Sequence, residues 1–72
     1  GFAEQFNNNW NFQVNEQSLT LHFDQPTSIA IYAIDGRLIF EQEMLDEATT
    51  IYLKKGGYLI HDGLKTEKVL IP

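Results

Sequence analysis

The chain has 72 residues, 43% of them hydrophobic, and a net charge of −5 from ten acids and five bases. This length suits one domain, and the absence of cysteine excludes both a disulfide framework and a cysteine-ligated zinc site. The bases are too scattered for phosphate contacts, and no apolar run approaches the ~20 residues that span a bilayer, so we expect neither nucleic-acid binding nor a membrane span.

Seven short segments have the composition of strands, and they span 11–14, 19–23, 29–34, 37–43, 49–53, 58–61 and 67–71. In the second segment, Leu19, Leu21 and Phe23 alternate with polar residues, which is the period-2 pattern of a strand with one buried face. The regular spacing of the intervening turn signals indicates an all-β sandwich or barrel, and we expect a small antiparallel sandwich of Ig-like type with about seven strands. We expect residues 10–72 to form this domain and residues 1–9 to be a linker or a frayed end.

The third and fourth segments flank Asp35-Gly36, a strong hairpin signal. A two-residue loop would pair Ala33 with Leu38. A three-residue loop, with the glycine in a left-handed conformation, would pair Tyr32 with Leu38 instead. Because a shift of one residue sends every side chain to the opposite face, the two registers bury different residues, and the sequence leaves both open.

The remaining elements follow from composition. Residues 44–48 favour a helix but are too few to form one, so we predict a loop there, and we predict turns over 54–57 and 62–66. In the last strand, alternation places Val69 and Ile71 inward and leaves Lys68 exposed. The predicted core includes Leu19, Leu21, Phe23, Ile31, Leu53, Ile60 and Val69.

The side chains that carry catalysis or bind metals form no recognisable motif. His22 and His61 lie in separate strands without a second histidine at metal-ligand spacing. No helix follows Gly56-Gly57, as a phosphate-binding loop would require. We therefore expect a non-enzymatic domain without a metal or cofactor.

Several aromatic residues are compatible with a platform on which sugar rings stack. They are Trp10, Phe12, Tyr32, Tyr52 and Tyr58. In a small β-domain, however, such side chains more often fill the core, and we favour that interpretation.

Three blocks in the second half of the chain share a pattern with a known family. Residues 29–39 read as an apolar strand, a glycine turn and a second apolar strand that begins with Arg37. Residues 51–60 contain Gly56-Gly57-Tyr58, and residues 68–71 are a lysine followed by an apolar strand. In order, spacing and terminal position, these blocks resemble the C-terminal sorting domain of proteins that the type IX secretion system of Bacteroidetes-type bacteria exports.

The resemblance covers about residues 19–72, with two departures. Ala33 stands where the family usually has Asp or Asn, and the usual Pro-Asn-Pro segment does not precede the first strands. The resemblance implies turn motifs at Asp35, Gly36, Arg37, Gly56, Gly57 and Tyr58, with Lys68 as a candidate recognition residue.

The resemblance further implies a secretion signal at the end of a larger exported protein. Its partners would be the type IX machinery and an upstream cargo domain in the same chain. It would occupy the periplasm in transit and then the outer-membrane surface or the medium. The alternative is an Ig-like spacer or a carbohydrate-binding accessory domain of a cell-surface protein.

Overall fold

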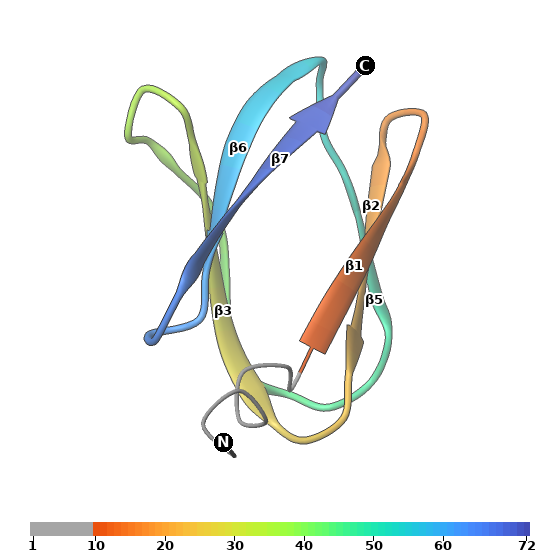
Figure 1. The fold of residues 1–72 in the computed structure, drawn as a ribbon, viewed down its shortest axis with the longest axis vertical. Coiled ribbons are helices and arrows are strands. Elements are labelled where there is room, and N and C mark those ends of the chain that lie inside the picture. Colours follow the sequence, from red (N-terminus) through yellow and green to blue (C-terminus); the bar gives the residue numbers. More distant parts are fainter. Residues whose placement is uncertain (1–9) are drawn as a thin grey trace, which may run out of the picture.

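The computed structural model describes residues 10–72, which form two antiparallel sheets packed face to face (Figure 1). The strands are β1 (Trp10–Asn15), β2 (Ser18–Phe23), β3 (Thr27–Ala33), β4 (Leu38–Leu45), β5 (Thr49–Tyr52), β6 (Gly56–His61) and β7 (Thr66–Ile71). One sheet has the order β1-β2-β5 and the other β4-β3-β6-β7. This all-β, Ig-like sandwich confirms the predicted fold class. The linker predicted for residues 1–9 lies outside the described residues.

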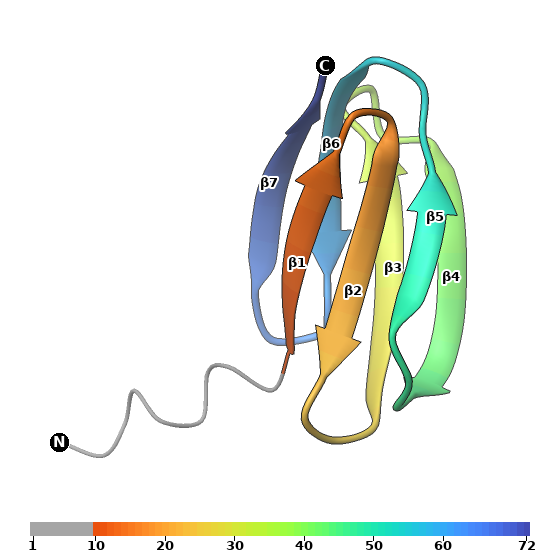
Figure 2. The same ribbon diagram turned by 90° about the vertical axis from the view of Figure 1, so that its right-hand side faces the viewer.

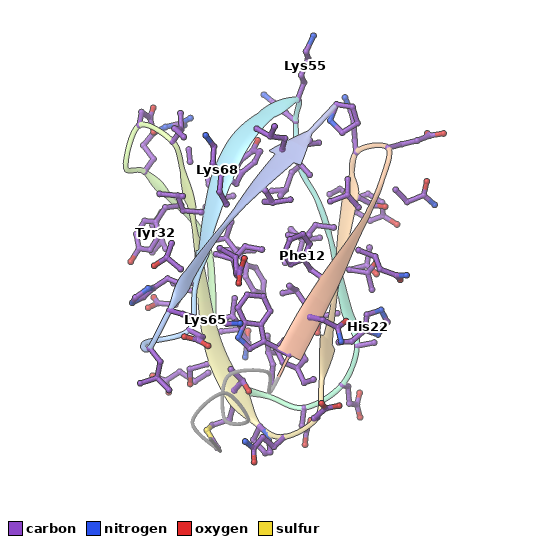
Figure 3. The ribbon with its side chains drawn as sticks, viewed as in Figure 1. Phe12, His22, Tyr32, Lys55, Lys65 and Lys68 are labelled. Carbon is purple, nitrogen blue, oxygen red and sulfur yellow. The ribbon has the colours of Figure 1, made fainter. Side chains whose placement is uncertain are left out.

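The core is a single layer of side chains between the two sheets, into which Phe12 points in Figure 3. Its buried members are Trp10, Leu19, Leu21, Ile29, Ile31, Ala33, Leu53, Tyr58, Ile60, Val69 and Ile71. Every predicted core residue except Phe23 is buried. Phe23 is only partly buried because it ends β2, opposite Trp10 at the start of β1, where the layer meets solvent.

All seven predicted strands are present, but several of their boundaries differ from the prediction; Thr66, for example, was predicted to lie in a turn and begins β7. Strand pairing explains two of the corrections. Met44 and Leu45 were predicted to lie in a loop, yet they complete β4, where Leu45 pairs with Thr27. Gly56 and Gly57 were predicted to lie in a turn, yet they open β6 and pair with the end of β7. In both places, hydrogen bonds to a neighbouring strand override the local preference of the sequence.

The β3–β4 hairpin has the three-residue loop. The Gly36 amide donates to the Ala33 carbonyl at 2.9 Å, and the Ala33 amide donates to the Arg37 carbonyl at 2.8 Å. Gly36 has φ of 98°, and Tyr32 pairs with Leu38. The loop therefore ends in the left-handed glycine that this register requires.

Two bulges on the β4 side then change the register. Ile31 pairs with Phe40, the partner that a two-residue loop would supply, because Ile39 is an extra residue in β4. A second irregularity lies near Met44, whose φ is 56° and whose amide donates to the Ser28 hydroxyl at 3.3 Å. The first bulge returns Phe40 to the inner face, where it packs against the core.

A polar clasp joins the two sheets at the end where β1 begins. The Trp10 indole donates to the Asp62 carboxylate at 2.7 Å, across 52 residues of sequence. The other carboxylate oxygen accepts the backbone amides of Leu64 and Lys65 at 2.8 and 2.7 Å. The Lys65 ammonium lies 5.1 Å from the centre of a Trp10 ring. The clasp thus ties β1 to the β6–β7 turn.

The charge of Asp62 contributes to the strength of this clasp. Burial by itself raises the pKa of Asp62, but hydrogen bonds from Trp10 and the two turn amides, with the charge of Lys65, lower it overall below the ordinary 3.8. Folding therefore favours the charged carboxylate. This contribution to stability is fully present above the ordinary aspartate pKa and is lost as pH falls through the lower folded-state value.

We predict that Ile31→Ala lowers the free energy of unfolding by about 2–5 kcal/mol, because it empties a fully buried site in a central strand. Ile34→Ala is the matched control, since Ile34 is 60% exposed and its truncation should cost within about 0.5 kcal/mol. Thermal unfolding followed by circular dichroism measures both. Equal losses in the two variants would contradict the assignment of inner and outer positions.

We predict that Asp62→Asn lowers the free energy of unfolding by about 1 kcal/mol at pH 7, because Trp10 loses a charged acceptor. The difference from the wild type should shrink as pH falls from about 5 to about 2. Denaturant titrations across this range measure it, with the exposed Asp46→Asn as a control expected to change little. A difference that stays constant to the lowest pH would show that the carboxylate charge does not contribute.

Candidate functional site

Because the core occupies the inner face of both sheets, any binding function must use the outer faces, the edges or the turns. Among residues 10–72, no three His, Asp or Glu side chains are grouped closely enough to hold a metal ion. The same part of the chain contains no helix that could cross a membrane. The surface features that remain are shallow hollows and the outer faces of the sheets.

Residues from two of the three blocks meet at one end of the four-stranded sheet. The Ile34 amide donates to the Gly57 carbonyl at 3.2 Å and thereby joins the β3–β4 turn to β6. A hollow of about 180 Å³ lies at this junction, and it is lined by Ala33, Ile34, Asp35, Arg37, Lys55, Gly56, Gly57 and Tyr58. The structure thus brings together five of the six predicted motif residues, and the sixth, Gly36, belongs to the same turn.

The polar groups of this hollow are held by short contacts. Asp35 accepts hydrogen bonds from the Arg37 backbone amide at 3.1 Å and from its guanidinium at 3.0 Å. These two interactions lower the pKa of the Asp35 carboxyl. The Tyr58 hydroxyl donates to the Lys54 carbonyl at 2.7 Å. Because the ion pair is solvent-exposed, it contributes little to stability but fixes both charges at the rim.

An apolar strip lies on the outer face beside the hollow. It consists of Tyr32, Ile34, Leu38, Leu59 and Leu70. Ile34 and Leu70 are 60% and 68% exposed, and both lie 3.6 Å from the position that a Cβ atom at Gly57 would take. Tyr32 is labelled in Figure 3 on the side of its sheet away from the core. Contiguous exposed apolar residues of this kind commonly mark an interaction surface.

Lys68 borders the strip on β7. It is exposed, as predicted, and pairs across the sheet with Leu59, while Val69 and Ile71 are buried, also as predicted. Lys68 does not line the hollow. It shares the outer face of β7 with Leu70, which contacts the edge of the hollow near Gly57. Among residues 10–72, β7 has no strand on its other side, so its backbone groups there are available to a partner.

The sequence analysis missed the apolar strip. Leu70 stands between two buried residues at a position where alternation in a one-sided sheet would place a polar residue. Ile34 and Leu38 flank the hairpin turn, and their outward direction depends on the register that the sequence left open. Consecutive apolar residues, at 29–34 and at 69–71, were the available signal.

No family model matches the chain, and no curated protein is significantly similar to it. The resemblance to type IX sorting domains therefore enters the functional argument as a proposal.

We predict that Gly36→Ala and Gly56→Ala each destabilise the domain by about 1 kcal/mol, because these glycines have φ of 98° and 150°. Gly57 differs from both, because its φ is not positive and a Cβ atom there would make ordinary 3.6 Å contacts. Gly57→Ala, the control, should therefore change the melting temperature little. Thermal unfolding of the three variants tests this order, and a larger loss in Gly57→Ala would contradict it.

Proposed function

We propose that this domain is a non-catalytic sorting signal, which the type IX outer-membrane machinery recognises at the end of an exported protein. The observation that carries the proposal is the convergence of the three blocks. Residues 29–39, 55–60 and 68–71 are distant in sequence, yet outward residues from each of them contribute to the hollow or to the apolar strip at the four-stranded sheet. A receptor could therefore read all three blocks at once.

The chemistry of this face suits a protein partner. Removing the exposed apolar side chains of Ile34, Leu38 and Leu70 from water would supply the main driving force, at about 25 cal/mol per Å² buried. Lys68 adds a positive charge beside this apolar area, whereas the charge of Arg37 is paired with that of Asp35. Charged residues around an apolar centre orient a partner of complementary charge and speed its association.

The regularity of β7 suggests how the partner docks. β7 pairs with β6 without any irregularity, whereas β4 at the opposite edge carries two bulges. Bulges obstruct the addition of a further strand, and a regular edge favours it. A receptor strand could add to β7 through backbone hydrogen bonds while its neighbouring side chains cover the apolar strip.

In this role, a receptor recognises the folded surface of the domain, so the domain needs no catalytic group. The upstream part of the same chain would be the cargo. The domain would cross the periplasm folded and reach the outer-membrane surface or the medium.

We predict that Lys68→Ala and Leu70→Ser each weaken export while leaving the fold intact, because both side chains are exposed. Residues 1–72 are fused to a periplasmic reporter in a bacterium with an active type IX system, and reporter at the cell surface and in the medium is measured. Melting curves of the isolated variants should stay within about 0.5 kcal/mol of the wild type.

The matched control is Leu64→Ser, which replaces a leucine that is 86% exposed in the β6–β7 turn, outside the strip. Its export should equal that of the wild type. Deleting residues 68–72 is less informative, because it also removes the buried Val69 and Ile71. Normal export of the Lys68→Ala/Leu70→Ser double variant, or no export of the unaltered fusion, would overturn the sorting role and favour an Ig-like spacer.

A further inference from the structure

The outer face of the three-stranded sheet differs chemically from that of the four-stranded sheet. Figure 2 views this face directly, with β1, β2 and β5 side by side. Strand register and burial place on it Asn11, Gln13, Asn15, Ser18, Thr20, His22, Thr50 and Tyr52. The set contains amides, hydroxyls, an imidazole and one phenol, and no Asp, Glu, Lys or Arg. Such a face is suited to hydrogen bonding with an uncharged polar partner.

Tyr32 and Tyr52 both depart from the expectation that the aromatic residues fill the core, and Tyr32 lies on the outer face of the other sheet. Trp10 and Tyr58 are buried and Phe12 packs against the core, but Tyr52 is 81% exposed. A single exposed aromatic side chain is ordinary. Tyr52 stands out because its ring forms one wall of a hollow of about 340 Å³ at the β1–β2 turn, whose other walls are Asn15, Glu16, Gln17 and Ser18.

The backbone around this hollow is held in place. Asn15 pairs with Ser18, and Ser18 pairs in turn with Tyr52. The Ser18 hydroxyl donates to the Asn15 carbonyl at 2.8 Å, and the Leu53 amide donates to the Gln17 carbonyl at 2.9 Å. The turn is therefore tied both within its own hairpin and to the end of β5. Because the backbone is already ordered, a ligand would have to order only the exposed side chains when it binds.

Within the described part of the chain, three of the polar side chains that line the hollow make no internal hydrogen bond or ion pair. No hydrogen bond or ion pair there engages the carboxylate of Glu16 or the side-chain amides of Asn15 and Gln17. Two amides and a carboxylate thus surround an exposed ring. Amides both donate and accept, and a carboxylate accepts from two adjacent hydroxyls.

Glu16 is also strained. Its φ is 57°, in a two-residue turn where the left-handed position strongly favours Gly, Asn or Asp. Glutamate at this position lowers the stability of the hairpin, and its carboxylate makes no hydrogen bond or ion pair within residues 10–72 in return. Strained residues that persist on a surface are often functional.

We propose that this hollow, with the ring of Tyr52 as its platform, binds a neutral oligosaccharide. The apolar C–H face of a pyranose ring would stack on Tyr52. Its hydroxyls would donate to the Glu16 carboxylate and exchange hydrogen bonds with the Asn15 and Gln17 amides. The uncharged strand face beyond would accommodate further sugar units along the Gln13 and Thr20 side. This site lies on the sheet opposite the one that carries the sorting proposal, and either proposal can fail without the other.

The test is a titration of the 72-residue chain with three neutral hexasaccharides, namely cellohexaose, mannohexaose and xylohexaose. The sugar concentration is raised to several times a dissociation constant of about 1 mM. Amide chemical shifts should move for Asn15–Ser18 and for Thr50–Tyr52, and for few residues of β6 and β7. Tyr52→Ala should weaken binding at least about tenfold, whereas Tyr52→Phe, which keeps the ring, should change it less than about threefold. Leu70→Ser on the other sheet is the control and should bind as the wild type does.

Two variants separate the strain of Glu16 from its chemistry. Glu16→Gly should raise the melting temperature and weaken binding, because it relieves the strain and removes the acceptor. Glu16→Gln should weaken binding without raising the melting temperature. Hexagalacturonate, a charged hexasaccharide, should not bind, because its carboxylates would face Glu16.

Shift changes centred on another face, no saturable binding of any neutral hexasaccharide, or undiminished binding by Tyr52→Ala would each overturn the proposal. Tighter binding of hexagalacturonate than of the neutral sugars would overturn the ligand class.

Discussion

Sharing one layer of buried side chains between two sheets is the constraint on which the rest of this structure depends. A chain of 72 residues without cysteine has no covalent reinforcement, so each strand must contribute its inner residues to that layer. The alternation that fills the layer also assigns every other residue to one of two outer faces or to an edge. Inward positions along each strand therefore determine stability, and outward positions are available for function. A substitution at an outward position can change binding with little effect on stability.

The period-2 pattern was enough to predict the sandwich and most of its core, because burial on one face leaves a local signature in the sequence. Leu19, Leu21, Ile31, Ile60 and Val69 are buried as that signature indicates. Features that depend on contacts between distant segments left no comparable signature. The Trp10–Asp62 clasp spans 52 residues, and nothing near either residue indicates the other.

The β3–β4 hairpin shows why the sequence left two registers open. Both were partly correct: the loop follows one register, and the central pair of Ile31 with Phe40 follows the other. The extra residue, Ile39, forms a bulge that joins the two registers. The bulge disrupts strand pairing only locally, and it returns Phe40 to the side of the sheet that faces the core. The candidate site also depends on the register of this hairpin, because the loop register determines that Leu38 points outward. The residues named from family resemblance were found in the hollow, but the apolar strip beside it required the register.

The two outer faces divide the remaining chemistry. Apolar side chains with flanking bases lie over the four-stranded sheet, and uncharged polar side chains lie over the three-stranded sheet. A ligand on one face is separated from a partner on the other by the whole core, so neither need displace the other. The two surfaces also differ in how their backbone is arranged. The strip beside β7 belongs to a regular edge that can accept a strand, whereas the Tyr52 hollow is open and lies against a turn whose backbone is tied to β5. An edge of the first kind suits a partner that adds a strand, and a hollow with an ordered backbone suits a small ligand that binds without rearrangement of the chain.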